Sequence, residues 1–234
     1  MNPAVHSEKQ YLIVYDADRI PEPDAAMFSA EFWRSSNAVV GEAAGRGNTL
    51  LLETGFGPAV LRHYRRGGWP AKLSEDRYLF TGIRRSRPYR EFHLLRKLTA
   101  LNLPVPAPLA AFIDNAFLSY RGALLMERIE GVRPLASMLG DSDCQWGQVG
   151  ACIARFHKAG VNHADLNANN ILVNSDAESV FLVDFDRCTL TEGHAVDGRR
   201  NLERLKRSLK KLWPTDGDHE LEACWQSLLD GYRV

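Results

Sequence analysis

The sequence predicts an α+β fold of two lobes, a small β-rich N-terminal lobe over residues 1–128 and a shortened helical C-terminal lobe over residues 129–234. Three observations support this prediction. Short apolar segments typical of strands gather in the first half, helical periodicity dominates the second half, and a short predicted hairpin interrupts those helices. The chain has 234 residues, of which 45% are hydrophobic, enough to bury a core in each lobe. A ligand cleft is expected between the lobes.

The first predicted elements are a strand over residues 10–15 and a helix over residues 24–34. Three strands follow, over residues 39–41, 49–53 and 59–64, and the turn Thr54-Gly55-Phe56-Gly57-Pro58 joins the last two into a hairpin.

Three glycines, Gly41, Gly45 and Gly47, lie between the first two of these strands. Glycine lets a backbone approach a phosphate closely and direct its N–H groups at it. A glycine-rich turn that binds no ligand is the commoner meaning of such a pattern. The interpretation as a phosphate loop depends on the position of these glycines between early strands.

Residues 89–101 predict a helix, because leucine and phenylalanine recur at three-residue steps. Glu91 near its start is either a solvated first-turn carboxylate or the ion-pair partner of Arg62 on the third strand. The three prolines in residues 103–108 exclude a helix there and predict an extended connector.

Residues 123–129, which include Glu127, predict an internal strand that is either only a core strand or also the linker whose backbone meets an adenine ring. The remaining pattern predicts helices over residues 146–159, 201–213 and 218–232.

The most informative segment is His163-Ala164-Asp165-Leu166-Asn167-Ala168-Asn169-Asn170. An aspartate two residues after a histidine, with an asparagine five residues later, is the layout of a kinase catalytic loop. Phosphoryl transfer needs a carboxylate near the attacking hydroxyl, here Asp165, and oxygen ligands that hold Mg²⁺ against the phosphates of ATP. The match alone is also compatible with a turn around a core histidine.

A second aspartate, Asp184, stands nineteen positions after Asp165 in the segment Val183-Asp184-Phe185-Asp186. The residues between read as two short strands around a polar turn, and such a hairpin returns Asp184 to Asn170. The sequence therefore predicts Asp165 as the catalytic base and Asn170 with Asp184 as the metal ligands.

The composition limits which partners and which cellular compartment we expect for this protein. The formal net charge is +0, which gives no argument for a nucleic-acid partner. The four cysteines form no C-x-x-C pair and suit buried thiols in a reducing compartment. The N-terminal residues lack the apolar stretch of a signal peptide, and no apolar run is long enough to span a membrane. We therefore expect a cytoplasmic protein, and the sequence indicates no protein partner.

Several further strings resemble the Kdo kinases of Gram-negative bacteria, which are similar to lipopolysaccharide core heptose kinases and, more distantly, to protein kinases. They cover roughly residues 30–210 and include Leu61-Arg62-His63-Tyr64-Arg65-Arg66-Gly67-Gly68-Trp69, Arg90-Glu91-Phe92, Leu103-Pro104-Val105-Pro106 and Leu182-Val183-Asp184-Phe185-Asp186-Arg187. The resemblance implies a protein-kinase-like fold and ATP-dependent phosphorylation of 3-deoxy-D-manno-octulosonic acid (Kdo) at its 4-hydroxyl. It also implies that the acceptor is Kdo-lipid IVA at the cytoplasmic face of the inner membrane.

The sequence departs from protein kinases at three points. Arg62 stands where the third-strand lysine is expected, and arginine has a planar fork instead of a compact ammonium. Asp186 replaces the glycine of D-F-G, which argues against a movable switch at that segment. No A-P-E follows, so a platform for protein substrates is not expected.

Basic residues concentrate between residues 62 and 97, a segment with eleven Lys or Arg but only three Asp or Glu. Arg84, Arg85, Arg87 and Arg90 lie within seven residues of one another and are either a solvated face or a contact for the acceptor and an anionic membrane surface. This charge disfavours the main alternative, a phosphotransferase for cationic acceptors such as aminoglycosides. A non-catalytic nucleotide-binding scaffold is the third hypothesis, and the presence of Asp165 with both metal ligands argues against it.

Overall fold

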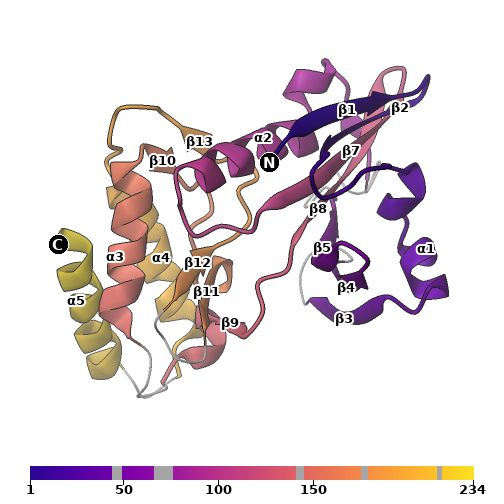
Figure 1. The fold of residues 1–234 in the computed structure, drawn as a ribbon. Coiled ribbons are helices and arrows are strands. Elements are labelled where there is room, and N and C mark those ends of the chain that lie inside the picture. Colours follow the sequence, from indigo (N-terminus) through magenta and orange to yellow (C-terminus); the bar gives the residue numbers. More distant parts are fainter. Residues whose placement is uncertain (44–48, 66–75, 141–144, 175–178, 215–217) are drawn as a thin grey trace. The chain divides into compact units, whose positions relative to one another are not determined.

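A computed structural model describes residues 1–43, 49–65, 76–140, 145–174, 179–214 and 218–234. It confirms a mixed α+β fold with a β-rich N-terminal part. The chain divides into two compact units (Figure 1). Unit 1 comprises Met1–Arg96 and Ala107–Ile129, and unit 2 comprises Lys97–Pro106 and Glu130–Val234.

Unit 1 is built on an eight-stranded antiparallel sheet in the order β1-β2-β7-β8-β5-β4-β3, with β6 paired to β8. The strands are β1 (Pro3–Ser7), β2 (Tyr11–Asp16), β3 (Val39–Ala43), β4 (Thr49–Thr54), β5 (Gly57–His63), β6 (Tyr78–Leu79), β7 (Pro108–Ala116) and β8 (Ser119–Glu127). Alternate residues of β4 and β5 are buried, including Leu50, Leu52, Ala59 and Leu61, so one face of these strands forms the core.

Three of these strands, β1, β6 and β7, were not predicted from the sequence. β7 lies between β2 and β8, but Ala110 and Ala111 in its interior have low strand propensity. The connector before β7 has no regular structure over residues 103–107, as its prolines predict.

The helical segments of this part are η1 (Ala25–Phe28), α1 (Ala30–Ser35), η3 (Ile83–Arg85) and α2 (Arg87–Ala100). The single helix predicted over residues 24–34 is wrong in one respect, because Ser29 interrupts it. The backbone of Ser29 is extended, and its Oγ accepts the N–H of Phe32, which starts a new helix. Helix α2 begins two residues earlier than predicted and buries Phe92, Leu95 and Leu98.

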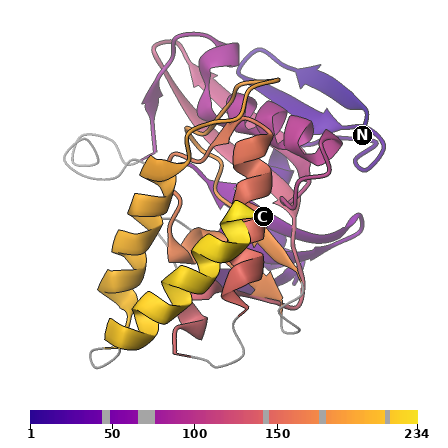
Figure 2. The ribbon, with the colours of Figure 1, turned by 90° about the vertical axis from the view of Figure 1, so that its left-hand side faces the viewer.

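Unit 2 combines two small sheets with three longer helices (Figure 2). Its strands are β9 (Val132–Pro134), β10 (Val161–Asn162), β11 (Ile171–Asn174), β12 (Val180–Leu182) and β13 (Thr189–Leu190). Its helical segments are η4 (Leu135–Met138), α3 (Trp146–Lys158), η5 (Ala168–Asn170), α4 (Arg199–Leu212) and α5 (Asp218–Arg233). The sheets have the orders β12-β11-β9 and β10-β13.

Glycines allow α3 and α5 to pack with their backbones in close contact. A Cβ atom on Gly150 would lie 1.9 Å from the carbonyl oxygen of Leu228, and one on Gly231 would lie 1.9 Å from that of Gly147. Any larger residue would force the two helices apart. Among the helices that the structure describes, none is both long and apolar enough to cross a bilayer.

Candidate active site

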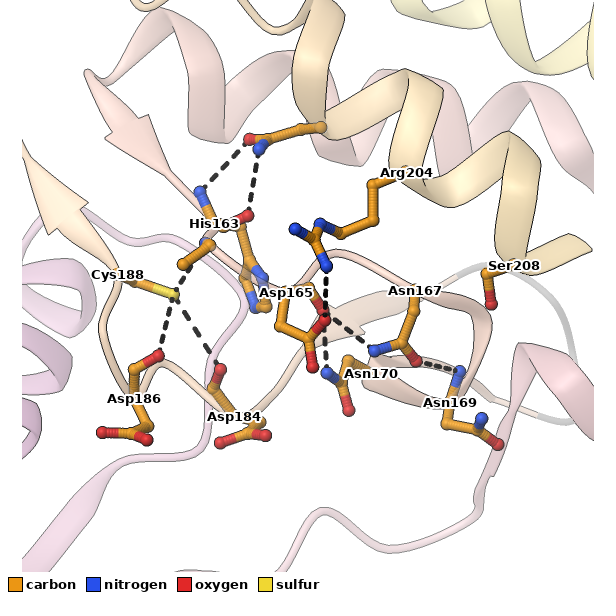
Figure 3. A network of polar contacts seen from close by, with 12 residues as sticks. His163, Asp165, Asn167, Asn169, Asn170, Asp184, Asp186, Cys188, Arg204 and Ser208 are labelled. Carbon is orange, nitrogen blue, oxygen red and sulfur yellow. Dashed lines mark hydrogen bonds and ion pairs between the residues drawn. The ribbon is translucent and has the colours of Figure 1, made fainter. Parts of the chain in front are cut away.

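The predicted catalytic loop is closed around the backbone of Asp165. The side-chain amides of Asn167 and Asn170 donate to the Asp165 carbonyl oxygen at 3.0 and 2.9 Å (Figure 3). Asn167 also accepts the N–H of Asn169 at 2.9 Å and thereby caps η5. These bonds use only the backbone of Asp165, and 56% of its side chain is exposed.

The hairpin that the sequence predicts behind this loop is confirmed. β11 and β12 pair with Ile171 opposite Leu182, and the Val183 N–H donates to the Asn170 carbonyl oxygen at 3.0 Å. Asp184 is the next residue after Val183, so this bond brings Asp184 close to Asn170. Asp184 has φ +64°, a left-handed conformation that costs energy in residues other than glycine and is enriched at functional sites.

These two residues suit a hard cation that takes its remaining ligands from phosphate and water. The Oδ1 atom of Asn170 has no partner among the described residues, while its amide nitrogen is fixed on Asp165. Within the same part of the chain, no group of three or more His, Cys, Asp or Glu side chains could bind a metal ion. One carboxylate and one amide oxygen are typical of Mg²⁺ bound with nucleotide phosphates.

His163 links the catalytic loop to the Asp184 segment. Its side chain is buried, its Nε2–H donates to the Val183 carbonyl oxygen at 3.0 Å, and its ring lies edge-on to Phe185 at 5.0 Å. Burial lowers the pKa of His163 below its ordinary value of 6.5, so the imidazole is neutral. His163 therefore holds two segments together, as expected for a core histidine.

Helix α4 supplies three contacts that the sequence analysis did not find. The buried Asn201 binds both backbone groups of His163, accepting its N–H at 3.2 Å and donating to its carbonyl oxygen at 3.0 Å. The Ser208 hydroxyl accepts the Ala168 N–H at 3.2 Å. Between them, Arg204 donates from Nη1 to Asp165 Oδ1 at 3.2 Å.

These three residues occupy positions i, i+3 and i+7 of α4 and so share one helical face. The spacing is visible in the sequence, but their partners lie 38 to 40 residues earlier in the chain. The sequence analysis predicted this helix but none of its contacts with the catalytic loop.

In unit 1, the expected ion pair between Arg62 of β5 and Glu91 of α2 is present, with Nη2 2.5 Å from Oε2. Glu91 is only 2% exposed, so this carboxylate depends on its partners for compensation. The Tyr64 hydroxyl donates to the same oxygen at 2.5 Å. Burial, and then the charge of Glu91, raise the pKa of Tyr64 well above its ordinary value and keep it a donor.

Two other predicted nucleotide contacts are modified by the structure. Gly41 lies within β3, opposite Leu51. The strand continues to Ala43, two residues beyond the end that the sequence predicted. Gly45 and Gly47 lie outside the described residues. The Glu127 carboxylate pairs with Arg19, and the backbone N–H of Glu127 donates to the Ala107 carbonyl oxygen. Both groups of Glu127 therefore already have partners within the protein.

The predicted arginine cluster divides into two kinds of residue. Arg84, Arg85 and Arg90 are exposed. Arg87 is half-buried, with its guanidinium 5.2 Å from the Tyr64 ring and 4.9 Å from the Tyr78 ring, and Nη1 donates to the Tyr78 hydroxyl at 2.5 Å. Arg87 therefore packs within unit 1, and the hypothesis of a surface contact applies to the other three.

Comparison with known proteins adds an independent line of evidence. A family model described as the lipopolysaccharide kinase (Kdo/WaaP) family matches residues 30–232. A 3-deoxy-D-manno-octulosonic acid kinase of Stenotrophomonas maltophilia (strain R551-3) is 47% identical over 202 residues, covering 86% of this chain and 80% of the relative.

Two relatives with the same name cover still more of the chain. The protein of Xanthomonas campestris pv. campestris (strain B100) is 46% identical over 224 residues, and that of Xanthomonas oryzae pv. oryzae (strain PXO99A) is 42% identical over 224 residues. Each alignment covers 95% of this chain and 89% of the relative. With the catalytic loop, the Asp184 segment and the Arg62–Glu91 pair in place, the chain belongs to the lipopolysaccharide kinase (Kdo/WaaP) family.

Proposed function

We propose that this protein uses ATP and Mg²⁺ to phosphorylate the 4-hydroxyl of Kdo on Kdo-lipid IVA. The observation that carries the proposal is the catalytic loop, where an exposed Asp165 carboxylate is held beside Asn170 and the Asp184 segment. Relatives that align with nearly the whole chain are named Kdo kinases, which supports this choice of acceptor.

Asp165 orients the acceptor hydroxyl and takes its proton as the oxygen attacks the γ-phosphorus. The new O–P bond forms while the bond from phosphorus to the bridging oxygen breaks, and ADP leaves. Asn170 and Asp184 would hold Mg²⁺, which neutralises phosphate charge when bound. Because the Asn170 amide is fixed on the Asp165 carbonyl, a shift of either residue would disturb both base and metal ligand.

Unit 1 supplies the proposed nucleotide contacts. The Arg62 guanidinium is 19% exposed, and the planar fork of arginine matches the geometry of a phosphate, so it suits an ATP phosphate. Gly41, Gly45 and Gly47 remain the proposed phosphate loop. For the adenine, the candidates are backbone groups that follow Arg128, since the N–H groups of Glu127 and Arg128 are both already donated.

We place the protein at the cytoplasmic face of the inner membrane as a peripheral protein. The exposed Arg84, Arg85 and Arg90 follow in the chain a segment that is held at the tip of the β7–β8 hairpin, where the Phe80 N–H donates to the Leu118 carbonyl oxygen. Phe117 is 89% exposed, and Leu79 and Leu118 are each 66% exposed. Apolar side chains beside a basic cluster suit an anionic bilayer surface.

Vesicle co-sedimentation at two salt concentrations tests the membrane contact. Binding to anionic vesicles should fall as salt rises and should weaken in R84E/R85E/R90E and in F117S/L118S. Substitution of the exposed Arg207, outside unit 1, is the matched control. Unchanged binding in both unit 1 variants would refute this contact without affecting the proposed reaction.

An acceptor comparison separates the proposed function from its two rivals. ATP turnover is measured with Kdo-lipid IVA, with kanamycin and without an acceptor. We expect stimulation by Kdo-lipid IVA alone. Stimulation by kanamycin would favour an aminoglycoside-type phosphotransferase, and absence of turnover with retained ATP binding would favour a non-catalytic scaffold.

A further inference from the structure

The Arg204 side chain reaches the catalytic carboxylate from a different element. Its Nη1 lies 3.2 Å from Asp165 Oδ1, and the two side chains are 48% and 56% exposed. Ion pairs this exposed add little to folding stability. The pair does place a permanent positive charge beside the proposed catalytic base.

The position of Arg204 is fixed although its side chain is not buried. Asn201, one turn earlier in α4, holds the backbone of His163, and Ser208, one turn later, holds the backbone of Ala168. The helix is thus attached to the catalytic loop on both sides of Arg204. The guanidinium can change partners while its Cα stays in register with Asp165.

Most of the binding capacity of this guanidinium is unused. Arginine has five N–H donors in a planar fork that matches a carboxylate or a phosphate with two parallel bonds. Within the part of the chain that the structure describes, Arg204 makes one hydrogen bond, to a single oxygen of Asp165. A second anion can therefore bind without any rearrangement of the helix.

The position of Arg204 indicates that the second anion belongs to the acceptor and not to ATP. In Figure 3, Arg204 approaches the Asp165 carboxylate from α4, whereas Asn170 and Asp184 lie on the other side of it in that view. Those two residues are the proposed metal ligands and mark where the phosphates of ATP would bind. An acceptor that presents its hydroxyl to Asp165 would therefore place its neighbouring groups near Arg204.

We propose that Arg204 binds the carboxylate of the acceptor sugar acid. The inference rests on the proposed function. In Kdo the carboxylate is attached to C2 and the reacting hydroxyl to C4. Only C3 lies between these two ring carbons. A single acceptor can thus give its hydroxyl to Asp165 and its carboxylate to Arg204, because these two side chains are neighbours, with Nη1 3.2 Å from Oδ1.

The same geometry makes the acceptor carboxylate a competitor of Asp165. Without acceptor, Arg204 pairs with Asp165. When the acceptor carboxylate takes both arms of the guanidinium, Asp165 is released to accept the hydroxyl proton. A cationic acceptor such as an aminoglycoside would be repelled at this position, so Arg204 also selects between acceptor classes.

The test compares two acceptors, Kdo-lipid IVA and the same lipid with the Kdo carboxyl converted to a neutral amide. The wild-type protein should prefer the acid by about 10-fold to 100-fold in kcat/KM, as expected for loss of a charged hydrogen-bonding group. R204A should lose a similar factor with the acid, mainly through KM, and should no longer distinguish the two acceptors. R204K should recover part of the preference, because it keeps the charge without the fork.

The affinity for ATP, measured as a Kd without acceptor, separates this role from a contact with the nucleotide phosphates and should be unchanged in R204A, because Arg204 is proposed to bind the acceptor and not ATP. R207A, an exposed arginine on the same helix, is the matched control and should behave as wild type. An equal loss with both acceptors, or a parallel loss of ATP affinity, would overturn the assignment. Transfer to neither acceptor by the wild type would instead refute the proposed function itself, and the role of Arg204 with it.

Discussion

At the scale of single residues, the candidate site depends on which groups already have partners. Asn170 uses its amide nitrogen and its carbonyl oxygen within the protein and keeps Oδ1 for a ligand. The Asp184 backbone is held in a left-handed conformation next to it. We propose on this basis that Asp184 is the charged metal ligand and Asn170 the neutral one.

Asp184→Asn should therefore raise the Mg²⁺ concentration needed for half-maximal activity and lower turnover severely. Asn170→Ala should have a milder effect on Mg²⁺, because a neutral ligand contributes less to binding a hard cation. Titration of activity with Mg²⁺ at saturating ATP measures both effects, and Asn169→Ala is the control. Parental Mg²⁺ dependence in both variants would place the metal elsewhere.

The Arg62–Glu91 pair gives a second prediction at this scale. Arg62→Ala removes a cation that pairs with the buried Glu91, and breaking a buried ion pair typically costs about 3–5 kcal/mol of stability. Arg62→Lys should keep part of that stability and part of the ATP use. Denaturant unfolding and the KM for ATP are measured for both variants.

The double variant R62A/E91Q separates these effects, because it removes both charges. It should regain stability relative to R62A but not ATP use. Full recovery of ATP use would show that Arg62 serves only to neutralise Glu91.

At the scale of elements, α4 is the element that supports the catalytic loop. Asn201 satisfies a buried N–H and a buried carbonyl group of His163. Asn201→Ala should cost about 1–3 kcal/mol for each buried group left unpaired, and turnover should fall with it because Asp165 follows two residues later. Thermal unfolding and kcat test this.

Asn201→Asp is the informative comparison, since it keeps the acceptor for the His163 N–H and loses the donor to its carbonyl. An intermediate stability is expected. Wild-type stability and turnover in Asn201→Ala would show that α4 does not position the loop.

The sequence predicted local features of the site better than long-range ones. Asp165, Asn170 and Asp184 could be proposed as site residues because catalytic loops space such residues at fixed intervals, and the structure places them on one loop and the hairpin behind it. The contacts of Asn201, Arg204 and Ser208 could not, because periodicity defines a helical face but not the segment it meets. Likewise, β7 was missed because the two strands beside it in the sheet decide its conformation more than its alanine-rich sequence does.

At the scale of the whole molecule, two buried histidines in unit 2 link its stability to pH. Burial lowers the pKa of both His157 and His163 below 6.5. Below about pH 6.5 the unfolded chain binds protons at these residues that the folded protein does not bind. The stabilisation is therefore fully present above that pH and is lost as the pH falls toward the folded pKa values.

The melting temperature should accordingly be lower at about pH 5.5 than at about pH 7.5, a range above the ordinary carboxylate pKa values. His157→Gln should reduce this difference, because it removes one of the two titrating groups. A melting temperature that is equal at both pH values would contradict the linkage.

The central claim is that Asp165 enables transfer of a phosphoryl group from ATP to Kdo-lipid IVA. The most direct measurement is the mass of the lipid after incubation with the protein, ATP and Mg²⁺. We predict a gain of one phosphoryl group with the wild type, and a rate lower by about 10²–10⁴-fold with Asp165→Ala, which should still fold and bind ATP. An unmodified lipid with the wild type, or a near-normal rate with Asp165→Ala, would contradict the account.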